Sequence, residues 1–177
     1  MITISHKFRQ HQIDAATTTL IIGTFNPDTA KNTADFFYSR NRNYLWRLLP
    51  IAFGQEDLKG KSPEEKRAFM QSAHIDFIDL IETVTIEAGQ ETNYADAFLD
   101  SRVTTWRDVI AVLQHLKNLR KVCLTRKSFA DIPTMKIRID AIRQHCLQHN
   151  IYFQCISTPT RFYTAAKQQE WRDFFNK

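Results

Sequence analysis

Residues 20–50 read LIIGTFNPDTAKNTADFFYSRNRNYLWRLLP, an apolar run followed by a polar turn and then by an aromatic, arginine-rich segment. The run from Thr18 to Phe25 has the length and β-branched content of a buried strand. Asn26-Pro27-Asp28 is a typical turn sequence. We therefore predict a strand, a short loop and the start of a helix here, and expect Leu20–Trp46 to form the working edge of the protein.

Three more apolar segments predict buried strands, at Ile75–Ile81, Lys121–Thr125 and Tyr152–Ile156. Helical patterns separate them, and strands joined by helices of this length indicate right-handed crossovers and a mainly parallel sheet covered on both faces. The predicted fold class is α/β, a three-layer α/β/α sandwich with a mainly parallel four-stranded central sheet. At 177 residues we expect one domain spanning 1–177.

The helices themselves have recognisable signals. Ser62-Pro63-Glu64-Glu65 is typical of a helix start, with a hydroxyl cap, a proline in the first turn and a glutamate placed to close a capping box. Three further helices are predicted from apolar residues at helical spacing: one after Thr104 and Thr105 that includes Trp106 and ends near Asn118, one through Met135–Cys146, and one from about Thr164 to Phe175.

Composition excludes several classes of protein. No run of about 18 apolar residues is present, and the N-terminus lacks the apolar core of a signal peptide. We therefore expect a cytoplasmic protein without a membrane span. We also expect a monomer. Three cysteines without a C-x-x-C pair predict neither a disulfide framework nor a four-cysteine metal site, and we interpret them as small core residues.

The net charge of +5 is unevenly distributed along the chain. Arg40–Arg47 and Lys117–Lys127 contain no acidic residue, whereas Asp79–Asp100 contains no lysine or arginine. Such segregation predicts a polarised surface whose basic side attracts phosphate. Ordinary solvated helix faces are the alternative interpretation.

Common catalytic motifs are absent. The sequence has no G-x-G-x-x-G, G-x-x-x-x-G-K-[ST], G-x-S-x-G or H-E-x-x-H, so dinucleotide binding, P-loop chemistry, serine hydrolase chemistry and zincin chemistry have no support in it. In parallel sheets ligands bind beyond the carboxyl ends of the strands. The segments that follow each predicted strand are therefore the candidate ligand-binding segments.

Two of those segments resemble motifs of the uracil-DNA glycosylase superfamily, closest to its mismatch-type and hypoxanthine-DNA glycosylase branches. The first motif region is similar over Gly23, Asn26, Pro27, Phe37, Tyr38, Arg40, Asn41, Arg42, Tyr44 and Trp46. The second, Cys155–Arg161, resembles a Ser/Pro-rich loop that follows the last strand and contacts DNA. The weaker segments around Ile78–Val84 and Val122–Lys127 are collinear with the family, so the resemblance covers most of the chain.

The resemblance implies a metal-free and cofactor-free DNA glycosylase that acts on duplex DNA carrying a damaged base, without a Schiff-base lysine. Such an enzyme must extrude the base, grip it and hold the strained backbone. The expected catalytic residues are Asn26, Thr158 and Thr160, and the expected base-binding residues are Phe37, Tyr38, Glu82 and Thr83. The expected DNA contacts are Arg40, Asn41, Arg42, Arg126, Lys127, Ser157, Arg161 and Phe162, with Arg161 or Phe162 filling the gap left in the duplex.

The sequence also departs from the family pattern. Gly23 and Asn26 are one residue further apart than in the mismatch-type enzymes, and the second motif lacks the usual histidine or asparagine. Glu82 stands where a neutral amide often reads uracil, and a carboxylate there argues against a uracil-dedicated enzyme. Two other hypotheses therefore remain: a catalytically inactive nucleic-acid or nucleotide-binding protein of the same fold, and an unrelated small-molecule α/β enzyme.

Overall fold

A parallel sheet forms the centre of the computed structural model, which describes all residues 1–177. Its strands are β2 (Thr19–Gly23), β3 (Ile75–Asp79), β6 (Lys121–Leu124) and β7 (Tyr152–Cys155), in the order β3-β2-β6-β7. Every neighbouring pair is parallel. The four predicted strands of the central sheet are confirmed.

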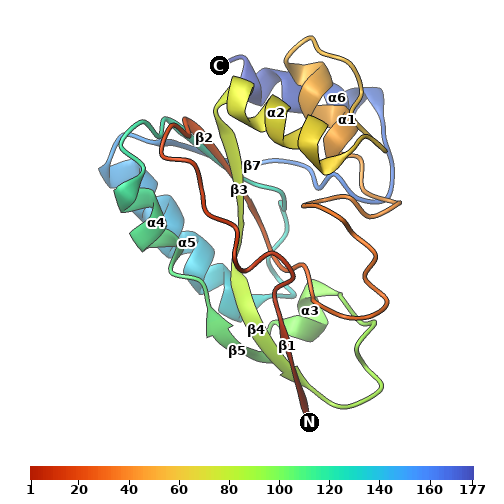
Figure 1. Cartoon of the computed structure of the whole chain (residues 1–177). Helices are drawn as coiled ribbons and strands as arrows, with labels where there is room; N and C mark the ends of the chain where they lie inside the picture. The colour runs from red at the N-terminus through yellow and green to blue at the C-terminus, as the bar shows by residue number, and fades with distance from the viewer.

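Helices cover both faces of this sheet (Figure 1). On one side lie α1 (Leu45–Ala52), α2 (Pro63–Ala73) and α6 (Ala165–Phe175), and on the other α4 (Val109–His115) and α5 (Pro133–Gln148). Alternate residues of β2 enter the two cores: Ile21 belongs to the cluster that contains Trp46 and Trp171, whereas Leu20 and Ile22 belong to the cluster of α4 and α5. This period of two is what a strand buried on both faces requires.

The helix starts have identifiable caps. The Ser62 hydroxyl accepts a hydrogen bond from the Glu65 N–H at 3.2 Å while the Glu65 carboxylate accepts one from the Ser62 N–H at 2.9 Å, which confirms the predicted capping box of α2. Thr164 caps α6 through the Lys167 N–H. Helix α5 is capped from a distance, because the Asp100 carboxylate accepts hydrogen bonds from the N–H groups of Thr134 and Met135.

A second, antiparallel sheet was not predicted. It contains β1 (Ile2–Ser5), β4 (Ile81–Ile86) and β5 (Val103–Trp106) in the order β1-β4-β5. Together with the short helix α3 (Asp96–Leu99) it occupies the end of the molecule that carries the N-terminus (Figure 1). None of the helices has both the length and the apolar character needed to span a bilayer.

Two predicted boundaries are wrong. The segment Ile75–Ile81 is not one strand, because the chain leaves the parallel sheet after Asp79 and Ile81 begins β4 of the antiparallel sheet. The helix predicted after Thr104 and Thr105 begins only at Val109, since Val103–Trp106 pairs with β4 as a strand. In both places the local sequence pattern fits more than one secondary structure. Pairing with a strand that is distant in the sequence determines where each element begins and ends.

Candidate functional site

The carboxyl ends of β2 and β3 bring Gly23 and Asp79 side by side, because these two residues are partners in the parallel register. A Cβ added to Gly23 would lie 2.2 Å from Asp79 Oδ1 and 2.4 Å from Tyr38 Oη. Only a glycine lets both oxygens approach the strand this closely. The groups that approach Gly23 are a carboxylate and a phenol.

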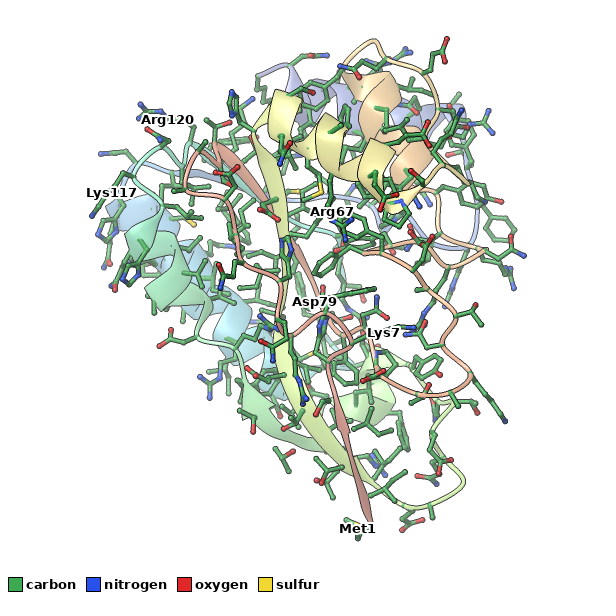
Figure 2. All side chains as sticks on the ribbon, in the orientation of Figure 1. Met1, Lys7, Arg67, Asp79, Lys117 and Arg120 are labelled. Atoms are coloured by element: carbon green, nitrogen blue, oxygen red, sulfur yellow. The ribbon has the colours of Figure 1, made fainter.

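His6 fixes the orientation of Asp79. The His6 ring is almost fully buried, and its Nε2 lies 2.7 Å from Asp79 Oδ2. Its other nitrogen, Nδ1, accepts a hydrogen bond from the Phe8 N–H at 3.1 Å. Because Nδ1 acts as the acceptor, Nε2 carries the proton and donates it toward the carboxylate. Asp79 lies near the middle of the molecule, close to Lys7 (Figure 2).

Tyr38 covers this carboxylate in an unusual conformation. Its backbone φ of 55° is in the left-handed region, which costs a non-glycine residue energy. The hydroxyl is buried without a well-formed hydrogen bond, although the Thr125 side chain lies close enough to lower its pKa slightly. Burial raises the pKa of Tyr38 well above its usual value, and the negative charge of Asp79 adds to the rise, so the phenol stays protonated.

Arg40 brings a half-buried positive charge to the same region. Its guanidinium lies 4.2 Å from the centre of the Tyr94 ring, and the Tyr94 hydroxyl is 2.9 Å from Thr29 Oγ1. Arg40 Nη2 is buried without a partner. Burial lowers the pKa of Arg40, an effect that Tyr94 and Asp79 partly oppose. The guanidinium remains charged, since its ordinary pKa is far above neutrality.

The two motif loops lie against each other. The Arg161 N–H donates to the Arg42 carbonyl at 3.0 Å, and the Tyr44 N–H donates to the Pro159 carbonyl at 2.8 Å. Asn43 and Thr160 form an antiparallel bridge between the same two segments. Residues more than a hundred positions apart in the sequence thus form one surface, with Asn41, Arg42, Thr158, Thr160, Arg161 and Phe162 all exposed on it.

The second loop is held in a defined shape. Thr158 Oγ1 and Thr160 Oγ1 are 2.9 Å apart, and Lys167 Nζ donates to the carbonyls of Thr160 and Phe162. Arg161 has a backbone φ of 73°, and the neighbouring Phe162 side chain is 65% exposed. Ser157 is less exposed than Thr158 and Thr160, and its carbonyl accepts a hydrogen bond from Trp171 Nε1.

Asn26 is buried at the same end of the sheet, and its side chain is already engaged. Asn26 Oδ1 accepts a hydrogen bond from Asn32 Nδ2 at 2.6 Å, and the Asn26 carbonyl accepts one from the Lys7 N–H. The side-chain oxygen of this expected catalytic residue is therefore already hydrogen-bonded in the structure.

Several residues predicted for the site lie elsewhere. Phe37 is 3% exposed and stacks within a cluster of aromatic rings, so it belongs to the core and Tyr38 is the ring at the site. Glu82 and Thr83 are in β4 and not in a loop after a parallel strand, and the Thr83 hydroxyl pairs with that of Thr104 on β5. Glu82 therefore gives no reason to exclude uracil as the base.

The basic run near β6 is also neutralised internally. Arg126 forms ion pairs with Asp96 at 2.5 Å and Asp131 at 2.6 Å, and Lys127 forms one with Glu170. Phosphate contacts by Arg126 would have to displace both carboxylates, so Arg42 and Arg161 are the better placed cations.

His6 and Asp79 were missed as site residues. The aspartate had a usable signal, since it is the acidic residue that ends a buried strand of a parallel sheet, where ligand sites form. His6 had none, because it reaches the site from the N-terminal segment through the unpredicted antiparallel sheet.

A separate hollow of about 430 Å³ lies at the opposite, amino end of β3. It is lined in part by His11, Thr17, Arg67 and Asp76, and the upper part of Figure 2 shows Arg67 on α2. The Asp76 carboxylate there accepts hydrogen bonds from the N–H groups of Asp14 and Phe77 and pairs with His11 Nε2 at 2.6 Å. None of the residues that line this hollow belongs to the two motif loops.

The fold is similar to that of a solved structure. A solution NMR structure of a candidate uracil DNA glycosylase from Methanosarcina acetivorans superimposes with a TM-score of 0.63, at 18% sequence identity, over 92% of this chain and 91% of that chain. No protein-family model and no curated protein matches the sequence. The comparison establishes the class of fold, a uracil-DNA-glycosylase-like α/β architecture. A fold of this class does not by itself define an activity, because one fold can carry many different sites.

Proposed function

We propose that this protein is a monofunctional DNA glycosylase that removes a damaged, deaminated base from DNA in base excision repair. In such a reaction water adds to C1′ of the deoxyribose as the C1′–N bond breaks, and the base leaves with the electron pair of that bond and takes up a proton. No other reactant is required. The proposal is supported by the fold and by the arrangement of the two motif loops.

The observation that carries the proposal is the junction of those loops above a set of buried polar groups. Arg42 and Arg161 are exposed cations held by one backbone hydrogen bond between their loops. Tyr38 and Arg40, in the segment that precedes Arg42, carry a buried hydroxyl and a buried guanidinium nitrogen without a well-formed hydrogen bond. An exposed basic rim over an unsatisfied polar interior is the arrangement that base extrusion needs, since phosphates bind outside and a base edge binds inside.

The proposed roles follow the positions of the side chains. Arg42, Asn41 and Arg161 contact phosphates, and Phe162 enters the gap that the extruded base leaves in the duplex. Tyr38 lies against the base, and the hydroxyls of Thr158 and Thr160 stabilise the leaving base anion. Asn26 orients the water after its hydrogen bond with Asn32 is exchanged for one to that water.

Incubation with labelled duplexes that carry uracil, hypoxanthine or xanthine, followed by alkaline cleavage of abasic sites, tests the proposal. Strand breaks at the lesion that disappear in an Arg42→Ala and Arg161→Ala double variant support it. Binding should weaken steeply as salt rises, because each phosphate contact releases counterions. Lesion-free binding that is indifferent to salt would argue against DNA as the partner.

A nucleic-acid-binding protein of the same fold without catalysis is the second candidate, and the engaged Asn26 side chain favours it. The two candidates differ in one result. Retained, salt-sensitive DNA binding with no strand break at any lesion supports the binding protein and refutes the enzyme.

A further inference from the structure

The hollow at the amino end of β3 lies outside the two motif loops and has no role in the proposed glycosylase. Its volume of about 430 Å³ is within the range of about 300–1,000 Å³ that is usual for small-molecule sites. Its wall combines the loop that precedes β2, the last turns of α2 and the first residues of β3. Arg67 marks the α2 side of this hollow in Figure 2, and Asp79 lies below it in the same view.

The wall contains hydrogen-bond donors that have no acceptor within the protein. The Thr17 hydroxyl is buried, with only 1% of the residue exposed, and it has no hydrogen-bond partner. The main-chain N–H groups of Gln12 and Ile13 also donate to no acceptor in the protein. Folded proteins satisfy nearly all of their buried polar groups, so an unpartnered hydroxyl in the wall of a hollow indicates a ligand that supplies its partner.

Arg67 adds a positive charge to these donors. Its guanidinium lies over the Phe36 ring, with 4.9 Å between the guanidinium carbon and the ring centre. It forms one ion pair, with the Glu64 carboxylate at 3.7 Å, and both side chains of that pair are more than half exposed. A guanidinium has five N–H donors in a planar fork, so most of them remain available to an oxyanion.

The carboxylates of the hollow are largely engaged within the protein. Asp76 is buried and accepts three hydrogen bonds, from His11 Nε2 and from the N–H groups of Asp14 and Phe77. Asp14 Oδ1 accepts one from the Ala16 N–H. Asp14 is exposed, so water solvates the rest of its carboxylate. Asp14 is therefore the one acidic group of the wall that opposes a bound anion.

The end of α2 is capped as well. The carbonyls of Met70 and Gln71 accept hydrogen bonds from the His74 N–H, and the His74 carbonyl accepts them from Thr18 and Thr19. The C-terminus of a helix opposes an anion through its unpaired carbonyls, and pairing these carbonyls reduces that opposition. Free donors thus exceed free acceptors in this hollow, and this balance favours an anionic ligand.

We propose that this hollow binds a small organic oxyanion, a molecule with one phosphate or carboxylate group on a compact, partly apolar body. The oxygen atoms of the ligand pair with Arg67 and with the free donors of Thr17, Gln12 and Ile13. The body packs against the apolar side chains of Ile13 and Met70. An organic body is part of the proposal because an inorganic oxyanion would leave most of the hollow unfilled.

NMR titration of the nitrogen-15-labelled protein tests the proposal and locates the ligand, because each main-chain N–H gives its own signal. The probes are inorganic phosphate, 2′-deoxyadenosine 5′-monophosphate, 2′-deoxyadenosine and benzoate. We expect at least one of the two organic anions to shift the N–H signals of Gln12, Ile13 and Thr17, with saturation below about 10 mM. The uncharged nucleoside should not shift them. The relative affinities of the nucleotide and benzoate distinguish a phosphate ligand from a carboxylate ligand.

Two variants change the charge of the hollow in opposite directions. Arg67→Gln should weaken binding of the organic anion by about tenfold, because it removes a charged donor. Asp14→Asn should strengthen binding by about two- to fivefold, because the amide has no negative charge and its oxygen still accepts from the Ala16 N–H. Arg138→Gln is the matched control and should bind like wild type, since Arg138 is also exposed on a helix and lies over the Trp106 ring at 5.3 Å.

The proposal is overturned if no probe shifts these signals, if the shifts are confined to Arg42 and Arg161, or if the nucleoside binds as tightly as its monophosphate. Inorganic phosphate that binds as tightly as the organic anions overturns it too. So do equal affinities of Arg67→Gln and Arg138→Gln. The three substituted side chains are exposed, and the spectra show whether each variant is folded. None of these residues belongs to the motif loops, so the outcome is independent of the proposed glycosylase activity.

Discussion

Tyr38→Phe should stabilise the free protein while weakening its function. The substitution removes one buried hydroxyl that has no well-formed hydrogen bond and leaves the ring, its packing and its backbone φ of 55° in place. A buried polar group without a partner costs about 1–3 kcal/mol, because its hydrogen bonds to water are lost on folding and are not replaced. The Thr125 side chain lies close enough to offset part of that cost at Tyr38 Oη, so we expect the free energy of unfolding to rise by about 1 kcal/mol.

The assay is urea unfolding followed by circular dichroism, with Tyr163→Phe as the matched control. The Tyr163 hydroxyl donates to Gln168 Oε1 at 3.2 Å, so its removal should lower the free energy of unfolding by about 0.5–1.5 kcal/mol. Opposite signs for the two tyrosines support the reasoning. A Tyr38→Phe protein that is destabilised as much as Tyr163→Phe refutes it, because its hydroxyl would then have a partner in solution. Lesion excision by Tyr38→Phe should fall, since Tyr38 is proposed to lie against the base and its hydroxyl is lost.

Three further substitutions test separate parts of the structure. Gly23→Ala should destabilise the fold by about 1–3 kcal/mol in urea unfolding, because its Cβ would lie 2.2 Å from Asp79 Oδ1; an alanine variant of wild-type stability would contradict the close approach. Phe162→Ala should change the free energy of unfolding by no more than about 0.5 kcal/mol, since the ring is 65% exposed. It should weaken binding to lesion duplexes by roughly tenfold, as measured by fluorescence anisotropy. Equal affinity of variant and wild type would exclude a role for Phe162 in the duplex gap. Asp100→Ala should cost about 1–2 kcal/mol in thermal unfolding by removing the cap of α5, with lesion excision retained; an unchanged melting temperature would show that the cap contributes nothing.

Much of the fold could be predicted from local pattern. The run around Leu20–Ile22 alternates between two cores, and its length and β-branched content predicted a buried strand before any partner was known. The capping box at Ser62 and Glu65 is closed within four residues, so the sequence alone contains both halves of it. The order of strands and helices then predicted a parallel sheet covered on both faces, and the position of ligand groups beyond its strand ends.

The assignment of single side chains was decided by tertiary structure. Phe37 and Tyr38 are adjacent aromatic residues with the same local signal, and a positive φ at Tyr38 sends one ring to the core and the other to the site. Arg126 belonged to a run without acids, but it pairs with Asp96 from another segment.

The sequence by itself therefore determined the layers of this protein and the edge where its site forms, because hydrophobic periodicity and helix caps act between near neighbours. Only the tertiary structure determined which groups meet there. His6 follows β1 of the antiparallel sheet, whereas Asp79 ends β3 of the parallel sheet. The loops of Arg42 and Arg161 join through backbone hydrogen bonds that carry no side-chain signature. Contacts of this kind depend on where distant segments pack, which no local pattern records.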